Sequence, residues 1–191
     1  MSKERMAAFS DGVIAVIITI MVLELKVPHG ENLEAIKPLI PVFLSYVLSF
    51  LYVGIYWNNH HHLLQASEFV NGRILWANLH LLFWLSLIPF TTGWLGENHV
   101  GSIPVAVYGL VLLFSAIAYT ILNRELACNH EGESALARSA GSGLKGTLSI
   151  VCYVAAIALA FVNPWISCAL YVLVALSWFI PDRGIESVLA S

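Results

Sequence analysis

The sequence predicts an all-α integral membrane protein with six transmembrane helices, forming a single domain over residues 1–191. Hydrophobic residues make up 59% of the chain and charged residues only 11%, whereas roughly a quarter of the residues of a soluble domain are charged. The apolar residues form long runs, and a spanning helix needs about 20 mostly apolar residues. The runs leave no room for a sizeable soluble domain.

The first expected helix covers residues 6–27. Basic residues precede its apolar run, as they do in a signal peptide. The run is too long for one, it carries Ser10 and Asp11 in its first turns, and it lacks a small-residue cleavage pattern before Pro28. We therefore expect it to remain attached as the first transmembrane helix.

Helix breakers and polar clusters divide the remaining chain into five further helices. They are expected over residues 38–59, 74–95, 103–122, 144–162 and 165–180. The last two are joined tightly at Asn163 and Pro164, and the last is short, so we expect it to tilt little or to stop below the interface.

The distribution of Lys and Arg predicts the orientation, because these residues concentrate on the cytoplasmic side. If the N terminus is cytoplasmic, only Lys26 and Lys37 lie outside. The others lie inside: Lys3, Arg5, Arg73, Arg124, Arg138, Lys145 and Arg183. We therefore expect a multi-pass protein of the cell membrane with both termini in the cytoplasm.

Charge and cysteine content exclude several functions. The formal net charge is only -3, and no basic run is present that would neutralise a track of phosphates, so nucleic acid is not an expected partner. The cysteines lack the paired spacing of a metal or redox site and are interpreted as packing residues.

Polar residues of the first three helices gather at one depth of the membrane, because the chain alternates direction. Ionisable residues inside spans are costly and are functional candidates. The group comprises Arg5, Ser10 and Asp11, then Asn58, Asn59, His60, His61 and His62, then Arg73, Trp76, Asn78 and His80. Its simplest interpretation is a polar clasp between helices, since an unpaired buried carboxylate is strongly unfavourable.

The three adjacent histidines do not predict a metal site. Consecutive residues of a helix point about 100° apart, so His60, His61 and His62 cannot converge on one ion as an i, i+4 pair does. We expect no bound metal and no cofactor.

The first helix also carries an apolar line. At about 100° per residue, Val16, Ile20 and Leu23 lie within roughly 40° of one direction, which Gly12 and Val27 share. Thr19 lies at the edge of this line, and Asp11 points about 140° away from Val16. By itself such a line is most simply explained by packing or lipid contact, and pore lining is the alternative.

The start of the first helix resembles the transmembrane protein 175 family of potassium channels. The resemblance is carried by Arg5, Phe9, Ser10, Asp11 and Gly12, spaced R-x-x-x-F-S-D-G, and by the V-I-A-V-I-I-T that follows. It continues through the later W-x-x-H of Trp57 and His60, and six spans in about 190 residues fit a single-repeat prokaryotic member. It implies a subunit whose four copies surround a central pore lined by the first helix.

The resemblance also implies which residues constrict that pore. Rings of Val16, Ile20 and Leu23 would narrow it, with Thr19 supplying a hydroxyl near the selective region. Val16 departs from the isoleucine or leucine common at the innermost ring, and this smaller side chain would widen it. No T-V-G-Y-G filter is present, so coordination by filter carbonyls is not expected.

The family further uses a structural polar network beside the pore. By resemblance it would comprise Arg5, Phe9, Ser10, Asp11 and His60, together with Trp76 or His80. The function implied is passive, potassium-selective or potassium-preferring conduction by a homotetramer in membrane lipid, with potassium as the permeant ion.

Two rival functions stay open at this stage. A secondary transporter or proton pathway would use Asp11 and the histidines as a relay, but the sequence shows neither two similar halves nor paired broken helices. A membrane-embedded metal enzyme would use the same residues, but the histidine geometry and the lack of a nucleophile motif argue against it. The chain is therefore not expected to be an enzyme.

Overall fold

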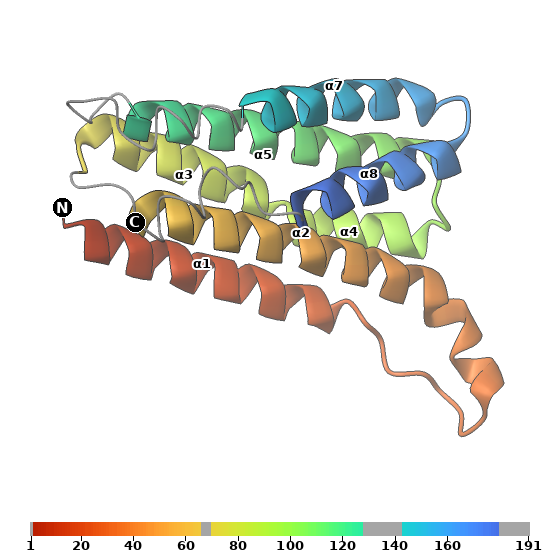
Figure 1. Ribbon diagram of the computed structural model, residues 1–191. Coiled ribbons are helices and arrows are strands. Elements are labelled where there is room, and N and C mark those ends of the chain that lie inside the picture. Colours follow the sequence, from red (N-terminus) through yellow and green to blue (C-terminus); the bar gives the residue numbers. More distant parts are fainter. Residues whose placement is uncertain (1, 66–69, 128–142, 180–191) are drawn as a thin grey trace.

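The computed structural model describes residues 2–65, 70–127 and 143–179, and they form a bundle of helices lying side by side (Figure 1). No strand occurs among these residues. The α-helices are α1 (Lys3–Leu23), α2 (Ile40–Gln65), α3 (Gly72–Ser86), α4 (Ile88–Glu97), α5 (Ser102–Ala127), α7 (Gly143–Leu159) and α8 (Pro164–Phe179). Two 3₁₀ helices, η1 (Leu33–Ala35) and η2 (Lys37–Leu39), precede α2. The all-α prediction is confirmed for the described residues.

Among residues 2–65, 70–127 and 143–179, four stretches are long and apolar enough to cross a membrane, judged by length and composition. They are Lys3–Leu23, Leu33–Gln65, Gly72–Glu97 and Ser102–Ala127. The helices α7 and α8 are apolar but shorter. Two basic residues used for the predicted orientation, Arg138 and Arg183, and the expected end of the last helix at residue 180 lie outside the described residues.

The ends of α1, α2 and α5 differ from the expected ones. α1 starts at Lys3 and ends at Leu23, before the expected residue 27. α2 continues to Gln65, past the expected residue 59, so the histidines lie within the helix. Lys3 Nζ donates to the Gln65 carbonyl over 3.1 Å and so satisfies a carbonyl at the end of α2. α5 likewise continues to Ala127.

The expected single helix over residues 74–95 is two helices, α3 and α4. Pro89 has no N–H and cannot donate to the carbonyl four residues earlier. Leu87 N–H bonds instead to the Trp84 carbonyl over 3.2 Å, and the ladder resumes with Thr91 N–H on the Leu87 carbonyl, also over 3.2 Å. The two helices still form one continuous apolar stretch.

Helix α1 lies along one edge of the bundle (Figure 1). It packs against α2, α3 and α4, while α5 packs between α3 and α7, and α8 lies on α7. One side of α1 is therefore covered by its own subunit and the other is open.

Glycines allow two close helix contacts. A Cβ on Gly96 of α4 would lie 2.7 Å from the Cα of Val42 in α2, so these backbones approach as only glycine permits. A Cβ on Gly109 of α5 would overlap the Tyr171 hydroxyl, which donates to the Val105 carbonyl over 3.1 Å. These contacts fix α4 against α2 and α8 against α5.

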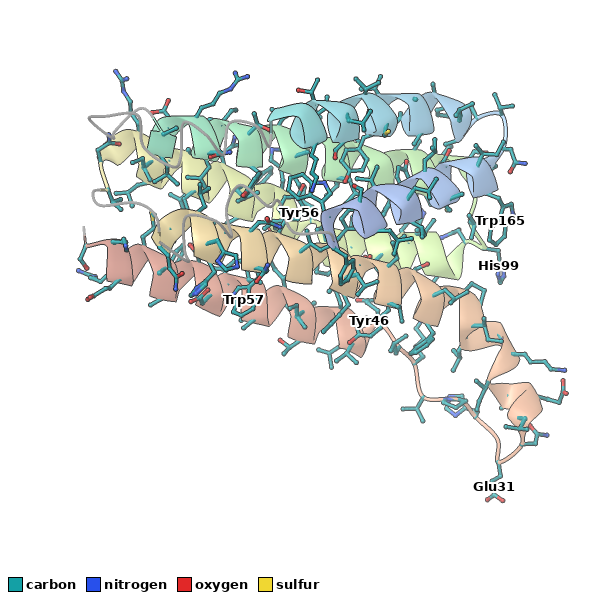
Figure 2. The ribbon with its side chains drawn as sticks, in the orientation of Figure 1. Glu31, Tyr46, Tyr56, Trp57, His99 and Trp165 are labelled. Atoms are coloured by element: carbon teal, nitrogen blue, oxygen red, sulfur yellow. The ribbon has the colours of Figure 1, made fainter. Side chains whose placement is uncertain are left out.

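The connection between α1 and α2 projects from the end of the bundle opposite the N terminus, with Glu31 at its tip (Figure 2). Lys26 forms an ion pair with Glu97 at the end of α4. The pair holds the connection near the end of α4. Because both side chains are largely exposed, it adds little stability.

Candidate pore-lining helix and its polar anchor

The two sides of α1 differ in burial. Met6, Ser10, Ile14, Ile17 and Met21 are buried, and their spacing of three or four residues places them on one face. The predicted pore residues lie on the other side: Val16 is 53%, Ile20 43% and Leu23 77% exposed. A single subunit thus leaves an aliphatic line of α1 uncovered.

Thr19 lies beside this line and is exposed. Its hydroxyl donates to the Val16 carbonyl within the helix over 2.9 Å. The hydroxyl hydrogen is therefore engaged, and the oxygen presents lone pairs to the surroundings of α1.

A buried chain of hydrogen bonds joins α1 to α2 and α3. Ser10 Oγ donates to the Met6 carbonyl over 2.8 Å, and Asn78 Nδ2 donates to Ser10 Oγ over 2.9 Å. Asn78 Oδ1 lies 2.7 Å from His60 Nε2. Since the amide oxygen only accepts, His60 carries its proton on Nε2, a tautomer assigned from these partners. Each member of the chain thus has a partner, as buried polar groups require.

Asp11 makes a second contact to α2. Trp57 Nε1 donates to Asp11 Oδ1 over 3.0 Å, and Figure 2 shows Trp57 on the side of α2 that faces α1. The Trp57 ring also stacks on His61, with 6.0 Å between the ring centroids. Asp11 is exposed in the isolated subunit, so this contact lies at the margin of the α1–α2 packing.

Several residues predicted for the polar network lie away from it. Arg5 is exposed, and its side chain forms no ion pair within the described residues. Phe9 is 50% and Trp76 75% exposed. His80 accepts a hydrogen bond from Trp84 Nε1 over 2.9 Å on the exposed side of α3. The structure thus joins Ser10 to Asn78 of α3 and Asp11 to Trp57 of α2. It leaves Arg5, Phe9, Trp76 and His80 outside the network.

Asn78 is the central residue of the network, but it was not among the predicted site residues. It belongs to the polar group of the third helix that the sequence indicated, yet Trp76 and His80 were preferred there. Residues two apart on a helix point about 200° apart, so α3 cannot direct Trp76 and Asn78 to the same neighbour. The signal that identifies Asn78 is its place among apolar residues on the face of α3 that packs against α1.

The histidine run provides three separate environments. His60 is bound to Asn78, while His61 Nε2 lies 2.9 Å from Gln65 Nε2. His62 Nδ1 is buried without a hydrogen-bond partner. Across residues 2–65, 70–127 and 143–179, no group of three or more His, Cys, Asp or Glu residues is placed to hold a metal ion.

Known proteins resemble this chain along its whole length. The model of a family described as "Endosomal/lysosomal potassium channel TMEM175" matches residues 5–89. A potassium channel of Chryseobacterium sp. (strain P1-3) is 56% identical over 190 residues, which cover 99% of this chain and 98% of the relative. The endosomal/lysosomal proton channel TMEM175 of Gallus gallus is 40% identical over 149 residues, 70% of this chain and 30% of the chicken protein.

The fold also matches a solved structure. The crystal structure of a lysosomal potassium-selective channel TMEM175 homolog from Chamaesiphon minutus superposes with a TM-score of 0.82 at 26% sequence identity. The match covers 95% of this chain and 97% of the homolog. The bundle is thus a known channel fold.

This fold, with an exposed aliphatic line on the polar-anchored helix α1, defines a multi-pass membrane protein of the ion-channel class. The chain belongs to the TMEM175 family. This family comprises ion channels and not enzymes, so the prediction that the chain is not an enzyme is confirmed.

Proposed function

We propose that this chain is a potassium-preferring cation channel, in which four copies surround a pore lined by α1. The observation that carries the proposal is the exposed aliphatic line of Val16, Ile20 and Leu23 on a helix whose other side is anchored in its own subunit. The names of the bacterial relative and the solved homolog, both potassium channels, support the ion assigned.

Conduction follows from the chemistry of the line. Rings of aliphatic side chains exclude water when the pore is narrow, and so close it by dewetting. When the helices separate, the rings admit a partly hydrated ion. The Ser10–Asn78–His60 chain holds α1 against its own subunit, so α1 moves together with α2 and α3.

Thr19 contributes to ion preference in this mechanism. Its hydroxyl hydrogen is engaged with the Val16 carbonyl, so its oxygen is free to accept a cation and to replace part of the hydration shell. Potassium gives up water more readily than sodium, which favours potassium. Apart from this ion, no cofactor is proposed.

The pore requires several copies, because one wall helix per subunit cannot enclose a path. Closed rotational symmetry is the usual arrangement of soluble homo-oligomers, and we propose fourfold symmetry for this membrane protein. Native mass spectrometry of the detergent-solubilised protein should give the mass of a tetramer. A particle that stays monomeric at every protein concentration would contradict the proposal.

Planar-bilayer recordings under a potassium-to-sodium gradient test the pore assignment. We expect Ile20→Asn and Leu23→Asn to raise the current or to shift the reversal potential towards zero, because an amide hydrates the constriction. Val22→Asn is the matched control: Val22 is 44% exposed, but it points about 120° away from Val16. If Val22→Asn has the same effect as the other two substitutions, α1 does not line the pore with this face.

Proton conduction is a second candidate, because the chicken relative is named a proton channel. Sealed vesicles loaded with a pH-sensitive dye distinguish the two ions. Potassium flux without acidification supports the potassium channel, and dye acidification that persists when potassium is absent supports proton conduction. Coupled, saturable flux would instead indicate a transporter.

We further propose that both termini face the cytoplasm and that the protein resides in the cell membrane. The predicted orientation rests on the Lys and Arg distribution. Single cysteines placed at Ser2 and at Glu31 of a variant without native cysteines give the test. A membrane-impermeant thiol reagent applied to intact cells should label the cysteine at 31 and spare the one at 2.

A further inference from the structure

The subunit contains a cavity that lies apart from α1. It has a volume of about 280 Å³ and is lined by residues of α2, α5, α7 and α8. A single buried water needs only about 10–15 Å³ of such space. The cavity is therefore large enough for part of an organic molecule.

The cavity follows the helix axes. Its lining extends from Ala116 to Ala127 along α5 and from Tyr52 to Asn59 along α2. At 1.5 Å per residue, these stretches are about 16 Å and about 10 Å long. An elongated slot parallel to membrane helices has the shape of an extended hydrocarbon chain.

Aromatic rings form much of its wall. Tyr119 of α5 meets Tyr56 of α2 edge to face at 6.0 Å between ring centroids, and it meets Trp178 of α8 at 6.4 Å. Figure 2 shows Tyr56 on the side of α2 away from α1. The lining suits an apolar chain, and the Tyr56 and Tyr119 hydroxyls, which make no hydrogen bond within the described residues, add weak polarity.

Charge is confined to one end of the slot. Arg124 and Ala127 belong to the last turns of α5, which ends at the same end of the bundle as the N terminus (Figure 1). Arg124 is exposed, and within the part of the chain that the structure describes it forms no ion pair and no carboxylate lines the cavity. An anionic group is thus favoured at this mouth, and a cation is not.

We propose that this cavity binds an anionic amphiphile, with its hydrocarbon chain between α2, α5 and α8 and its acidic head group on Arg124. The chain would run parallel to the helices and leave the head group at the membrane interface. A membrane phospholipid and a free single-chain acid share this chemistry. The site is independent of the pore assignment, because α1 does not line it.

Binding is tested with two probes on the full chain. Native mass spectrometry of the protein from nanodiscs of phosphatidylcholine and phosphatidylglycerol measures retained phospholipid. Titration with dodecyl phosphate in neutral detergent measures the single-chain acid. Retention of phosphatidylglycerol without dodecyl phosphate binding identifies a phospholipid site, and saturable dodecyl phosphate binding identifies a site that also accepts free acids.

Two substitutions fill the slot. A Cβ on Gly146 would lie 3.9 Å from Thr120 Oγ1, and both residues line the cavity, so Gly146→Leu and, independently, Thr120→Leu should abolish binding. Arg124→Gln should weaken it about tenfold, the effect of losing one charge-assisted hydrogen bond. Gly72→Leu, which has open space around its Cβ, and Arg73→Gln are the matched controls and should bind like the wild type.

Binding that survives both Leu substitutions overturns the cavity assignment, and so does the absence of binding of either probe to the wild type. Equal retention of phosphatidylcholine and phosphatidylglycerol overturns the anionic preference. Should Gly146→Leu not fold, as judged by size-exclusion profile, Thr120→Leu provides the same test.

Discussion

The side chain of Asn78 in α3 donates to the hydroxyl of Ser10 in α1 over 2.9 Å, in a site where both residues are buried. Through its other amide atom Asn78 reaches His60 of α2. One asparagine therefore fixes the rotation of α1 relative to two neighbouring helices. That rotation determines which residues of α1 remain uncovered.

Asn78→Ala should destabilise the subunit. It removes the partner of the buried His60 Nε2 and one partner of Ser10, and an unsatisfied buried polar group costs about 1–3 kcal/mol. We expect a lower midpoint of thermal unfolding in detergent, measured by intrinsic tryptophan fluorescence. The control is Asn58→Ala, because Asn58 is exposed on α2. Equal effects of the two substitutions would show that the network contributes no stability.

The contact between Trp57 and Asp11 is expected to be weaker but measurable. Trp57→Phe removes the indole donor, and Asp11→Ala removes the acceptor of the 3.0 Å bond. A double-mutant cycle should give a coupling energy of about 1 kcal/mol. If the free-energy changes of the two single substitutions add up to that of the double variant, solvent replaces this bond at the exposed margin of α1 and α2.

Gly96→Ala should destabilise the protein although alanine favours helices. Its Cβ would lie 2.7 Å from the Val42 Cα, so α4 and α2 must separate, and such overpacking typically costs about 1–3 kcal/mol. Gly54→Ala is the matched control in α2, because nothing lies within 4 Å of its Cβ. There the higher helix propensity of alanine should stabilise by up to about 1 kcal/mol. A higher unfolding midpoint for Gly96→Ala would contradict the close approach.

The Lys26–Glu97 ion pair should be insensitive to pH over the physiological range. The hydrogen bond that Lys26 donates to Glu97, and then the charge of Glu97, raise the pKa of Lys26 above its ordinary 10.5. A raised folded-state pKa contributes stability that is present below the unfolded pKa and is lost as the pH rises through the folded value. Unfolding midpoints of wild type and Lys26→Gln should thus differ equally at pH 6 and pH 8, and the difference should shrink only above about pH 10. A difference that changes between pH 6 and pH 8 would implicate another titrating group.

Helical periodicity was enough to predict the apolar line of α1. Val16, Ile20 and Leu23 were placed in one direction by angle alone, and all three are exposed in the subunit. The same arithmetic separated Asp11 from that line, and Asp11 instead contacts Trp57. Periodicity succeeds here because α1 is one unbroken helix at the edge of the bundle.

The partners of the polar residues were not predictable in this way. Trp76 and His80 lie about 40° apart on α3, while Asn78 points about 200° from Trp76. Either the Trp76 and His80 face or the Asn78 face of α3 can meet α1, but not both. Which face does so depends on how α3 packs against α5, where the Trp84 ring stacks on Phe114 with 4.4 Å between the ring centroids. The break at Pro89 was missed because the apolar pattern continues through it.

Phe9 gives the last prediction. The resemblance assigned it to the polar network, but it is 50% exposed, and its direction lies about 20° from that of Val16. We therefore expect Phe9 to extend the line of Val16, Ile20 and Leu23 towards the N terminus and to narrow the entrance of the pore. Phe9→Ala should raise single-channel conductance in planar bilayers without lowering the unfolding midpoint. Phe161→Ala is the control, because Phe161 is 66% exposed between α7 and α8. If Phe9→Ala instead leaves the conductance unchanged and lowers the unfolding midpoint, Phe9 has a structural role and does not narrow the pore.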